Sequence, residues 1–278
     1  VNCKETVLLL TVIKQVKTKD PCGRYPGGAD SERRFIMDSR VPEIRKHLKK
    51  KLDAYRYEHT LGVEFTCQAL AMRYGYDLDK ADLAGLLHDS AKRFEDPVML
   101  QKCLDRNIPV TAEEERDPSL LHAKLGAWMA EHKYEVDDPE ILSAITCHTT
   151  GKPGMSLLDK ILYVADYIEP RRSKAANLTA MRKLAFIDLD EACLEIMESI
   201  LVYLKSTGCQ VDPMTEAACE DMRRVVSERK KETAGEASAV TGITHQDKEE
   251  QSVESVKRNG KTCSRGFGRE KRRRRKNY

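Results

Sequence analysis

The chain of 278 residues is long enough for one large domain or two small ones, and its 40% of hydrophobic residues can form a core. A charged fraction of 33% and a mean hydropathy of −0.57 indicate a polar surface, and no apolar run reaches the roughly 18 residues that a membrane span needs. The nine cysteines are scattered without a CxxC motif, which favours a reducing, cytoplasmic compartment over a disulfide framework.

The net charge of +3 is unevenly distributed along the chain. Residues 248–278 contain twelve Lys or Arg and four Asp or Glu, so this segment carries +8 and the rest of the chain carries −5. Blocks of like charge are usually disordered. We therefore expect residues 232–278 to form a polar, basic, disordered tail, and this tail is the only part of the chain through which contact with nucleic acid is possible.

The helical pattern defines a central domain over residues 38–231. Residues 1–37 contain a turn-rich stretch, Pro21–Gly28, and are expected to form a poorly packed extension. Apolar residues then recur every three or four positions from Val41, which predicts one helix that continues to Gly75.

Capping residues mark the helices that follow. Asp79 is expected to cap the helix that runs to Asp89. Asp138 and Pro139 predict the start of the helix that carries His148, since proline is favoured at the first helical position.

Three more helices complete the domain. Ser156 and Asp159 resemble a capping box at the start of a helix that ends at Glu169. A long amphipathic helix is expected over Leu184–Leu204, and a last one from Asp212 to about Lys231. The apolar face of the long helix can serve either the core or a homodimer contact.

Four histidines and two aspartates lie in apolar helical contexts. One histidine on an apolar face is most often an ordinary core residue, but the pair His88-Asp89 ends the apolar run Ala81–Leu87, where both groups are costly to desolvate without a partner. A carboxylate at Asp166, after another apolar run, poses the same problem. A bound metal ion would offset the desolvation cost of all these side chains. The candidate ligands are His59, His88, Asp89, His122, His148 and Asp166.

This ligand chemistry predicts a hydrolase. Imidazole and carboxylate together suit iron, manganese, zinc or cobalt. Six side chains are enough for two ions if Asp89 bridges them through its two oxygens. A pair of ions about 3.5–4 Å apart can activate a water and neutralise a phosphoryl group. His47, His132 and His245 are expected to be exposed to solvent.

The order of these six residues resembles that of the HD-domain phosphohydrolase superfamily. Three segments, Arg56–Val63, Ala84–Lys92 and Asp159–Pro170, resemble those of its bacterial YqeK family, and the likeness covers roughly residues 41–228. The resemblance implies an all-α helical bundle with a buried dinuclear metal site. It also implies an enzyme that cleaves the dinucleoside polyphosphate diadenosine tetraphosphate symmetrically into two ADP with a di-iron centre.

The resemblance also implies how the ligands divide. One metal would be held by His59, His88, Asp89 and Asp166, and the second by Asp89, His122 and His148. Catalysis by a metal-bound hydroxide would then involve Asp89 and Lys92. Because the folded part is acidic, local cations must hold the phosphates, and the candidates are Arg56, Lys92, Arg171 and Arg172.

Two other functions remain open from the sequence. One is an HD-domain phosphohydrolase of another nucleotide, such as a deoxynucleoside triphosphate, a nucleoside monophosphate or a cyclic dinucleotide. The other is an RNA- or ribosome-associated protein that binds through the basic tail.

Overall fold

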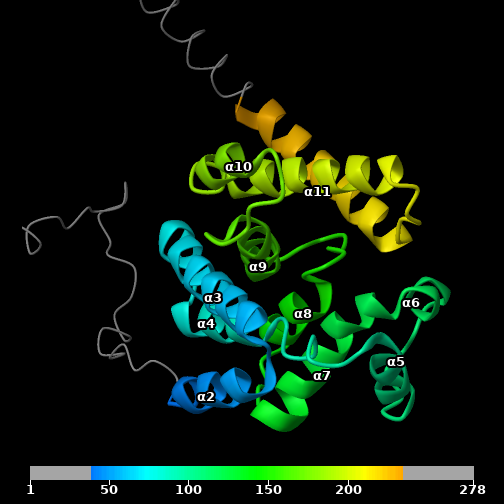
Figure 1. Cartoon of the computed structure of the whole chain (residues 1–278). Helices are drawn as coiled ribbons and strands as arrows, with labels where there is room; N and C mark the ends of the chain where they lie inside the picture. Colours follow the sequence, from blue (N-terminus) through cyan, green and yellow to red (C-terminus); the bar gives the residue numbers. More distant parts are fainter. Residues whose placement is uncertain (1–38, 234–278) are drawn as a thin grey trace, which may run out of the picture. The chain divides into compact units, whose positions relative to one another are not determined.

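The computed structural model describes residues 39–233 (Figure 1). The predictions for the extension over residues 1–37 and for the basic tail therefore lie outside the described residues, apart from residues 232–233. The chain divides into two compact units, the first ending at Glu58 and the second beginning at His59. Each of the six candidate metal ligands belongs to the second unit.

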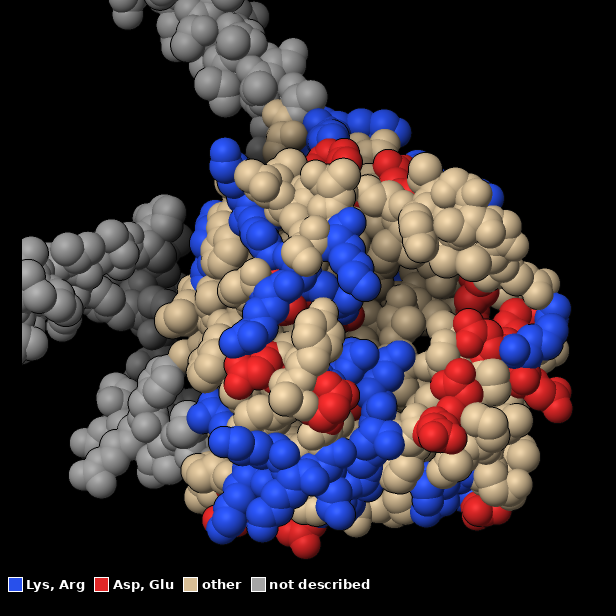
Figure 2. All heavy atoms as spheres, viewed as in Figure 1, with Lys and Arg blue, Asp and Glu red and all other residues tan. Residues whose placement is uncertain are grey.

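The first unit contains α2 (Val41–Lys51) and the first turn of α3 (Ala54–Tyr74). The prediction of one helix from Val41 to Gly75 is wrong, because Leu52 is extended and ends α2. Apolar residues keep the same spacing on both sides of this break, so periodicity alone could not reveal it. Lys and Arg side chains gather over α2 in Figure 2, and the last turn of this helix is basic.

The second unit is built from helices, as the fold class predicted, and residues 39–233 contain no strand. None of the helices in this described range is long and apolar enough to cross a membrane. After α3 come α4 (Leu78–Leu87), α5 (Asp96–Leu104), α6 (Ala112–Arg116), the 3₁₀ turn η1 (Pro118–Leu120), α7 (Leu121–Tyr134), α8 (Pro139–Cys147), α9 (Leu157–Ile168), α10 (Leu178–Leu184), α11 (Leu189–Ser206) and a helix over residues 213–233.

Helix α4 lies at the centre of the packing around the candidate ligands. It contacts α7, α8 and α9, while α8 also packs against α7 and α9 (Figure 1). Residues 81–90 are all buried, including the polar side chains of Asp82, His88 and Asp89. A Cβ at Gly85 would lie 2.7 Å from Glu64 Cα, so glycine is what allows α3 and α4 to approach this closely.

The predicted caps are confirmed at two helices and wrong at one. Asp138 caps α8 through the main-chain N–H groups of Glu140 and Ile141, and Ser156 with Asp159 forms the capping box of α9. At α4 the cap is Asp77 and not Asp79. Asp77 accepts from the N–H groups two and three residues ahead, which places Asp79 inside the first turn.

The long helix predicted over Leu184–Leu204 is wrong at its start. The chain forms α10 first, turns, and begins α11 at Leu189, where Asp188 accepts from Glu191 N. The last helix begins at residue 213 as predicted and continues to the end of the described residues.

Candidate metal centre

The six candidate ligands come from five helical segments of the second unit. His59 lies in the first part of α3, and Asp166 lies in the last turn of α9. Helix ends supply the other four: His88 and Asp89 follow α4, His122 is in the first turn of α7, and His148 follows α8. The four histidines and Asp89 are each at most 3% exposed.

Asp89 lies between two pairs of histidines. Its Oδ2 is 3.8 Å from His59 Nε2 and 3.5 Å from His88 Nε2. Its Oδ1 is 3.5 Å from His122 Nε2 and 3.7 Å from His148 Nε2. The two oxygens of one carboxylate therefore face two groups of donors that could each hold a metal ion, and Asp89 belongs to both groups.

Asp166 lies beside the first of these groups. Its Oδ1 is 3.1 Å from His59 Nε2 and accepts a hydrogen bond from Arg172 Nη2 at 2.6 Å. Arg172 Nε also donates to the main-chain oxygen of Asp166 at 3.0 Å. Asp166 therefore lies next to the group of residues around Asp89, which it contacts through His59, and its carboxylate is also paired with Arg172.

Three histidines are oriented by main-chain carbonyl groups three residues earlier. His88 Nδ1 donates to Gly85 O, and His148 Nδ1 donates to Ile145 O, each at 2.7 Å. His122 Nδ1 makes the equivalent bond to Ser119 O. A carbonyl oxygen can only accept, so Nδ1 carries the proton and the Nε2 lone pair of each ring faces the Asp89 side.

The protonation states of the site suit a cation. Burial, which outweighs the charge of Asp89, lowers the pKa of His88 to about 4. Burial and the neighbouring His148 lower the pKa of His122 to about 3, and the positive charge of Lys92 contributes in the same direction. Neutral imidazole is the form that binds metal.

The carboxylates stay ionised at neutral pH. Burial opposes this at Asp89, but the surrounding histidines hold its pKa well below the ordinary value. At Asp166, His59 and Arg172 likewise overcome burial and lower the pKa. Burial alone would lower the pKa of His59, yet the carboxylates of Asp166 and Glu169 raise it.

Two buried nitrogen atoms show that the residues fit a metal. His59 Nε2 and His88 Nε2 have no hydrogen-bond partner among residues 39–233. A buried polar atom without a partner is costly, and a cation between these nitrogens and Asp89 would remove that cost. The side chains at this position therefore have the donor types, the burial and the ionisation of a divalent metal site.

The candidate phosphate-binding residues have different surroundings. Lys92 is half-buried in the turn after α4, where its main-chain N–H donates to Asp89 O. Arg172 contacts Asp166 as described, whereas Arg171 is exposed and uses its main-chain N–H to donate to Glu169 Oε2. Arg56 belongs to the first unit, where its main-chain N–H donates to Asp53 Oδ1.

Two polar residues of this site were missed by the sequence analysis. Thr149 Oγ1 lies 3.1 Å from His122 Nε2. Glu169 is fully buried, with Oε1 3.1 Å from His59 Nδ1. Glu169 was interpreted only as the end of a helix. A glutamate three residues after Asp166, next to a proline that breaks the helix, was the available signal.

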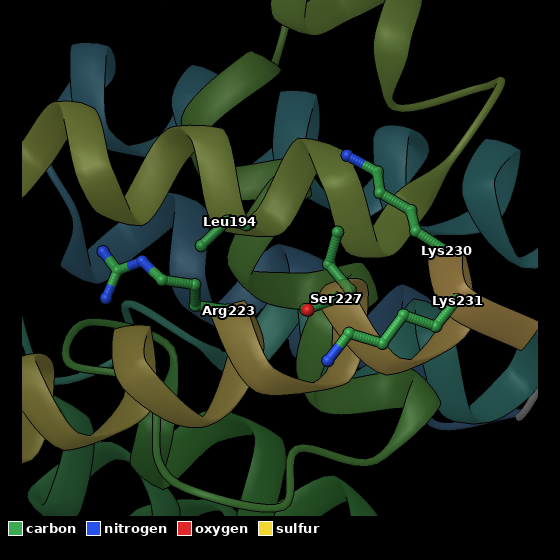
Figure 3. Close-up of a pocket in the computed structure, with 6 residues that line it drawn as sticks. Leu194, Arg223, Ser227, Lys230 and Lys231 are labelled. Carbon is green, nitrogen blue, oxygen red and sulfur yellow. The ribbon is translucent and has the colours of Figure 1, made fainter.

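Two cavities in the second unit are lined by other residues. One, of about 400 Å³, lies between α11 and the helix over residues 213–233, with Leu194 and Lys231 among its lining residues (Figure 3). The other, of about 530 Å³, is lined by residues such as Phe65 of α3 and Phe186 after α10. None of the six candidate ligands lines either cavity.

Comparison with known proteins agrees with the geometry. A family model described as HD domain matches residues 56–171, a range that contains all six candidate ligands. A symmetrical bis(5'-nucleosyl)-tetraphosphatase of Bacillus subtilis is 39% identical over 168 residues, which are 60% of this chain and 89% of that protein. The protein of the same name from Staphylococcus aureus is 33% identical and covers 59% of this chain and 84% of its own length.

A solved structure is also similar. It is a predicted HD superfamily hydrolase involved in NAD metabolism from Clostridium acetobutylicum, with a TM-score of 0.64 and 36% identity. The match covers 66% of this chain and 96% of that one. With the identity and coverage of the tetraphosphatases, these findings lead to one conclusion: the chain belongs to the HD-domain family of symmetrical bis(5'-nucleosyl)-tetraphosphatases.

Proposed function

We propose that this protein is a metal-dependent hydrolase that cleaves diadenosine tetraphosphate symmetrically into two molecules of ADP. The observation that carries the proposal is the position of Asp89 between two pairs of buried histidines, in a chain whose relatives bear the name of this activity. One water is consumed, one phosphoanhydride bond is broken, and each half leaves with two phosphates.

We assign the ligands to two metal positions. His59, His88, Asp89 and Asp166 would hold the first, and Asp89, His122 and His148 would hold the second, so Asp89 would be shared by both. Iron is the metal that we propose, and manganese, zinc or cobalt would suit the same ligands. When bound, such a pair supplies Lewis-acid activation of water and neutralises phosphate charge.

The side chains around the metal positions bind and orient the substrate. Lys92 is close enough to His122 to influence its pKa, so its ammonium group can hold a phosphate oxygen at the second position. Arg172 is 42% exposed on the side of Asp166, and its planar group can hold phosphate oxygens at the first. Arg171 is a further phosphate-binding candidate in the second unit, and Arg56 stays a prediction from the sequence.

The experiment is product analysis on the protein loaded with iron or manganese. Diadenosine tetraphosphate should yield ADP alone, because the central bridge is the bond that is broken. AMP together with ATP would overturn the symmetrical cleavage. A substrate panel with a deoxynucleoside triphosphate and a cyclic dinucleotide should show slower turnover, and a preference for either would overturn the choice of substrate.

Variants test whether the cluster carries the activity. His148→Gln removes a donor from the second position and should lower kcat by about 100-fold or more, because loss of a group that only supports a ligand already costs about 10- to 100-fold. The matched control is His132→Gln, since His132 is exposed and stacks on Trp128 with ring centroids 4.2 Å apart. Equal activity of the two variants would contradict the assignment.

A further inference from the structure

His59 differs from the other three histidines of the cluster in what orients its ring. The rings of His88, His122 and His148 each donate to a main-chain carbonyl three residues earlier. His59 Nδ1 instead pairs with Glu169 Oε1 at 3.1 Å, a side chain 110 residues later in the chain. His59 lies within α3, where main-chain carbonyl groups already accept hydrogen bonds of the helix itself. The acceptor for its Nδ1 comes from another element.

Glu169 is held in place by hydrogen bonds to its carboxylate and to the main chain around it. Its side chain is fully buried, and its Oε2 accepts from Arg171 N at 2.7 Å. Arg182 donates to the carbonyl groups of Ile168, Glu169 and Arg172, which holds the segment after α9 in one conformation. The carboxylate is therefore a fixed acceptor at the His59 ring.

The helix that carries His59 is shaped to admit this carboxylate. A Cβ at Gly62 would lie 2.4 Å from Glu169 Oε2, which is closer than two such atoms can approach. Glycine costs helix stability at an interior position of α3. The close contact with Glu169 gives a physical reason for this glycine.

We infer that Glu169 is a positioning residue that acts through His59 and makes the first metal position the tighter of the two. This inference rests on the proposed function, because it assumes that His59 and Asp89 hold a metal. A carboxylate on the far nitrogen of a ligating imidazole fixes the orientation of the ring and makes the ligating nitrogen more basic.

The distribution of charge supports the same order of affinity. Asp89 is shared by both positions, while Asp166 and Glu169 lie only on the His59 side, where Arg172 offsets one of their charges. On the other side His122 and His148 accompany the shared carboxylate, and the positive charge of Lys92 acts on His122. A cation therefore meets more negative charge at the first position.

The test is titration of the metal-free 278-residue protein with Mn²⁺. Calorimetry measures the Kd of each position, and bound-metal analysis measures how much metal the protein holds. Glu169→Gln keeps an acceptor for His59 Nδ1 without the charge, and Glu169→Ala removes both. The Kd of the tighter position should rise by about 10- to 100-fold in Glu169→Ala, with Glu169→Gln in between, while the weaker position keeps its Kd.

A second variant disturbs the contact between Glu169 and His59 without replacing Glu169 itself. Gly62→Ala should displace the carboxylate from His59 and weaken the tighter position as well, even though alanine favours the helix. The control is Asp159→Asn, another fully buried carboxylate, which accepts from Ser143 Oγ and pairs with Lys152. Asp159→Asn should lower stability without changing the ratio of the two Kd values.

The outcomes separate this inference from the proposed function. If the wild type binds metal and releases ADP but the Glu169 and Gly62 variants keep both Kd values, the inference is overturned and the proposed function stands. The inference is also overturned if Asp159→Asn changes the ratio as Glu169→Ala does. If the wild type binds no metal, the proposed function fails first.

Discussion

At the scale of single residues, the unusual property of this protein is the number of imidazole rings buried around one carboxylate. Rings such as His88 and His122 stay neutral because burial penalises their charged form, while the pKa of Asp89 among them lies well below its ordinary value. Such an arrangement is ready to accept a cation without first releasing protons from these two rings. Protons and metal should therefore compete chiefly at His59, whose pKa is raised.

These pKa values predict how stability depends on pH in the EDTA-treated protein. His88 and His122 have folded pKa values of about 4 and 3, below the unfolded value of about 6.5, so only the unfolded chain takes up their protons as the pH falls below 6.5. His59 has the opposite sign: its contribution is present below the unfolded pKa and is lost as the pH rises through the folded pKa.

The combined effect of His88 and His122 is larger than the opposite effect of His59. The free energy of unfolding should therefore fall as the pH is lowered from about 6.5 to about 4, by about 1.4 kcal/mol per pH unit for each ring whose effect is not offset. Urea unfolding at several pH values measures this slope. His122→Gln should reduce the slope and His132→Gln should not. Stability that stays constant or increases on acidification would contradict the buried, neutral state of these rings.

At the scale of elements, the site depends on where helices end. His88 and His148 are the C-cap residues of α4 and α8, and His122 is in the first turn of α7. The position at which each helix starts or stops therefore sets the direction of a ligand. Asp77 and Asp138 cap the opposite ends of α4 and α8, a helix length away from these histidines.

The cap of α4 provides a direct test at this scale. Asp77→Ala removes the acceptor for the N–H groups of Asp79 and Lys80, and should lower the free energy of unfolding by about 1 kcal/mol. The metal-loaded protein should keep its kcat, since Asp77 is exposed at the far end of the helix from His88. Urea unfolding and steady-state kinetics measure the two quantities.

The neighbouring residue is the matched control for this cap. Asp79→Ala should change stability by a few tenths of a kcal/mol, because Asp79 interacts with the helix dipole and does not cap the N–H groups. A larger effect at Asp79 than at Asp77 would mean that the helix begins two residues later in solution.

Helix starts marked by a cap or a proline were predictable, and breaks without such a mark were not. Asp138-Pro139 and Ser156 with Asp159 were found because each satisfies N–H groups of its own helix. The break at Leu52 was missed because the apolar spacing is continuous across it. Asp79 was chosen over Asp77 because two aspartates stand near the same helix start, and only the backbone at Asp77 is extended.

At the scale of the whole molecule, the fold class was predictable because helical periodicity concerns nearby residues and the family resemblance implied the same class. The grouping of the six candidate ligands came from the order and context of polar residues in apolar runs, together with the family resemblance. The context of Glu169 beside a proline was a signal for the residue, but its pairing with His59 could not be predicted, because the two are 110 residues apart and no periodic pattern links them. Contacts at such separations follow from the packing of α3 against the segment after α9.

Since the candidate ligands are spread from His59 to Asp166, binding of metal should stabilise the folded second unit as a whole. A ligand at 100 times its Kd adds about 2.7 kcal/mol to the free energy of unfolding, so EDTA should lower Tm by several degrees and added Mn²⁺ should restore it. Thermal unfolding followed by circular dichroism measures the change. Asp89→Ala is the control and should show no response to Mn²⁺; an equal response in that variant would place the metal elsewhere.

The shared carboxylate limits how the two positions can be separated genetically. Because each oxygen of Asp89 faces a different pair of rings, any replacement of Asp89 damages both positions together. Each of the four histidines faces one oxygen only, His59 and His88 on one side and His122 and His148 on the other. If both proposed positions are filled, a form with a single metal therefore has to be engineered at a histidine, and the histidine that is replaced decides which position remains.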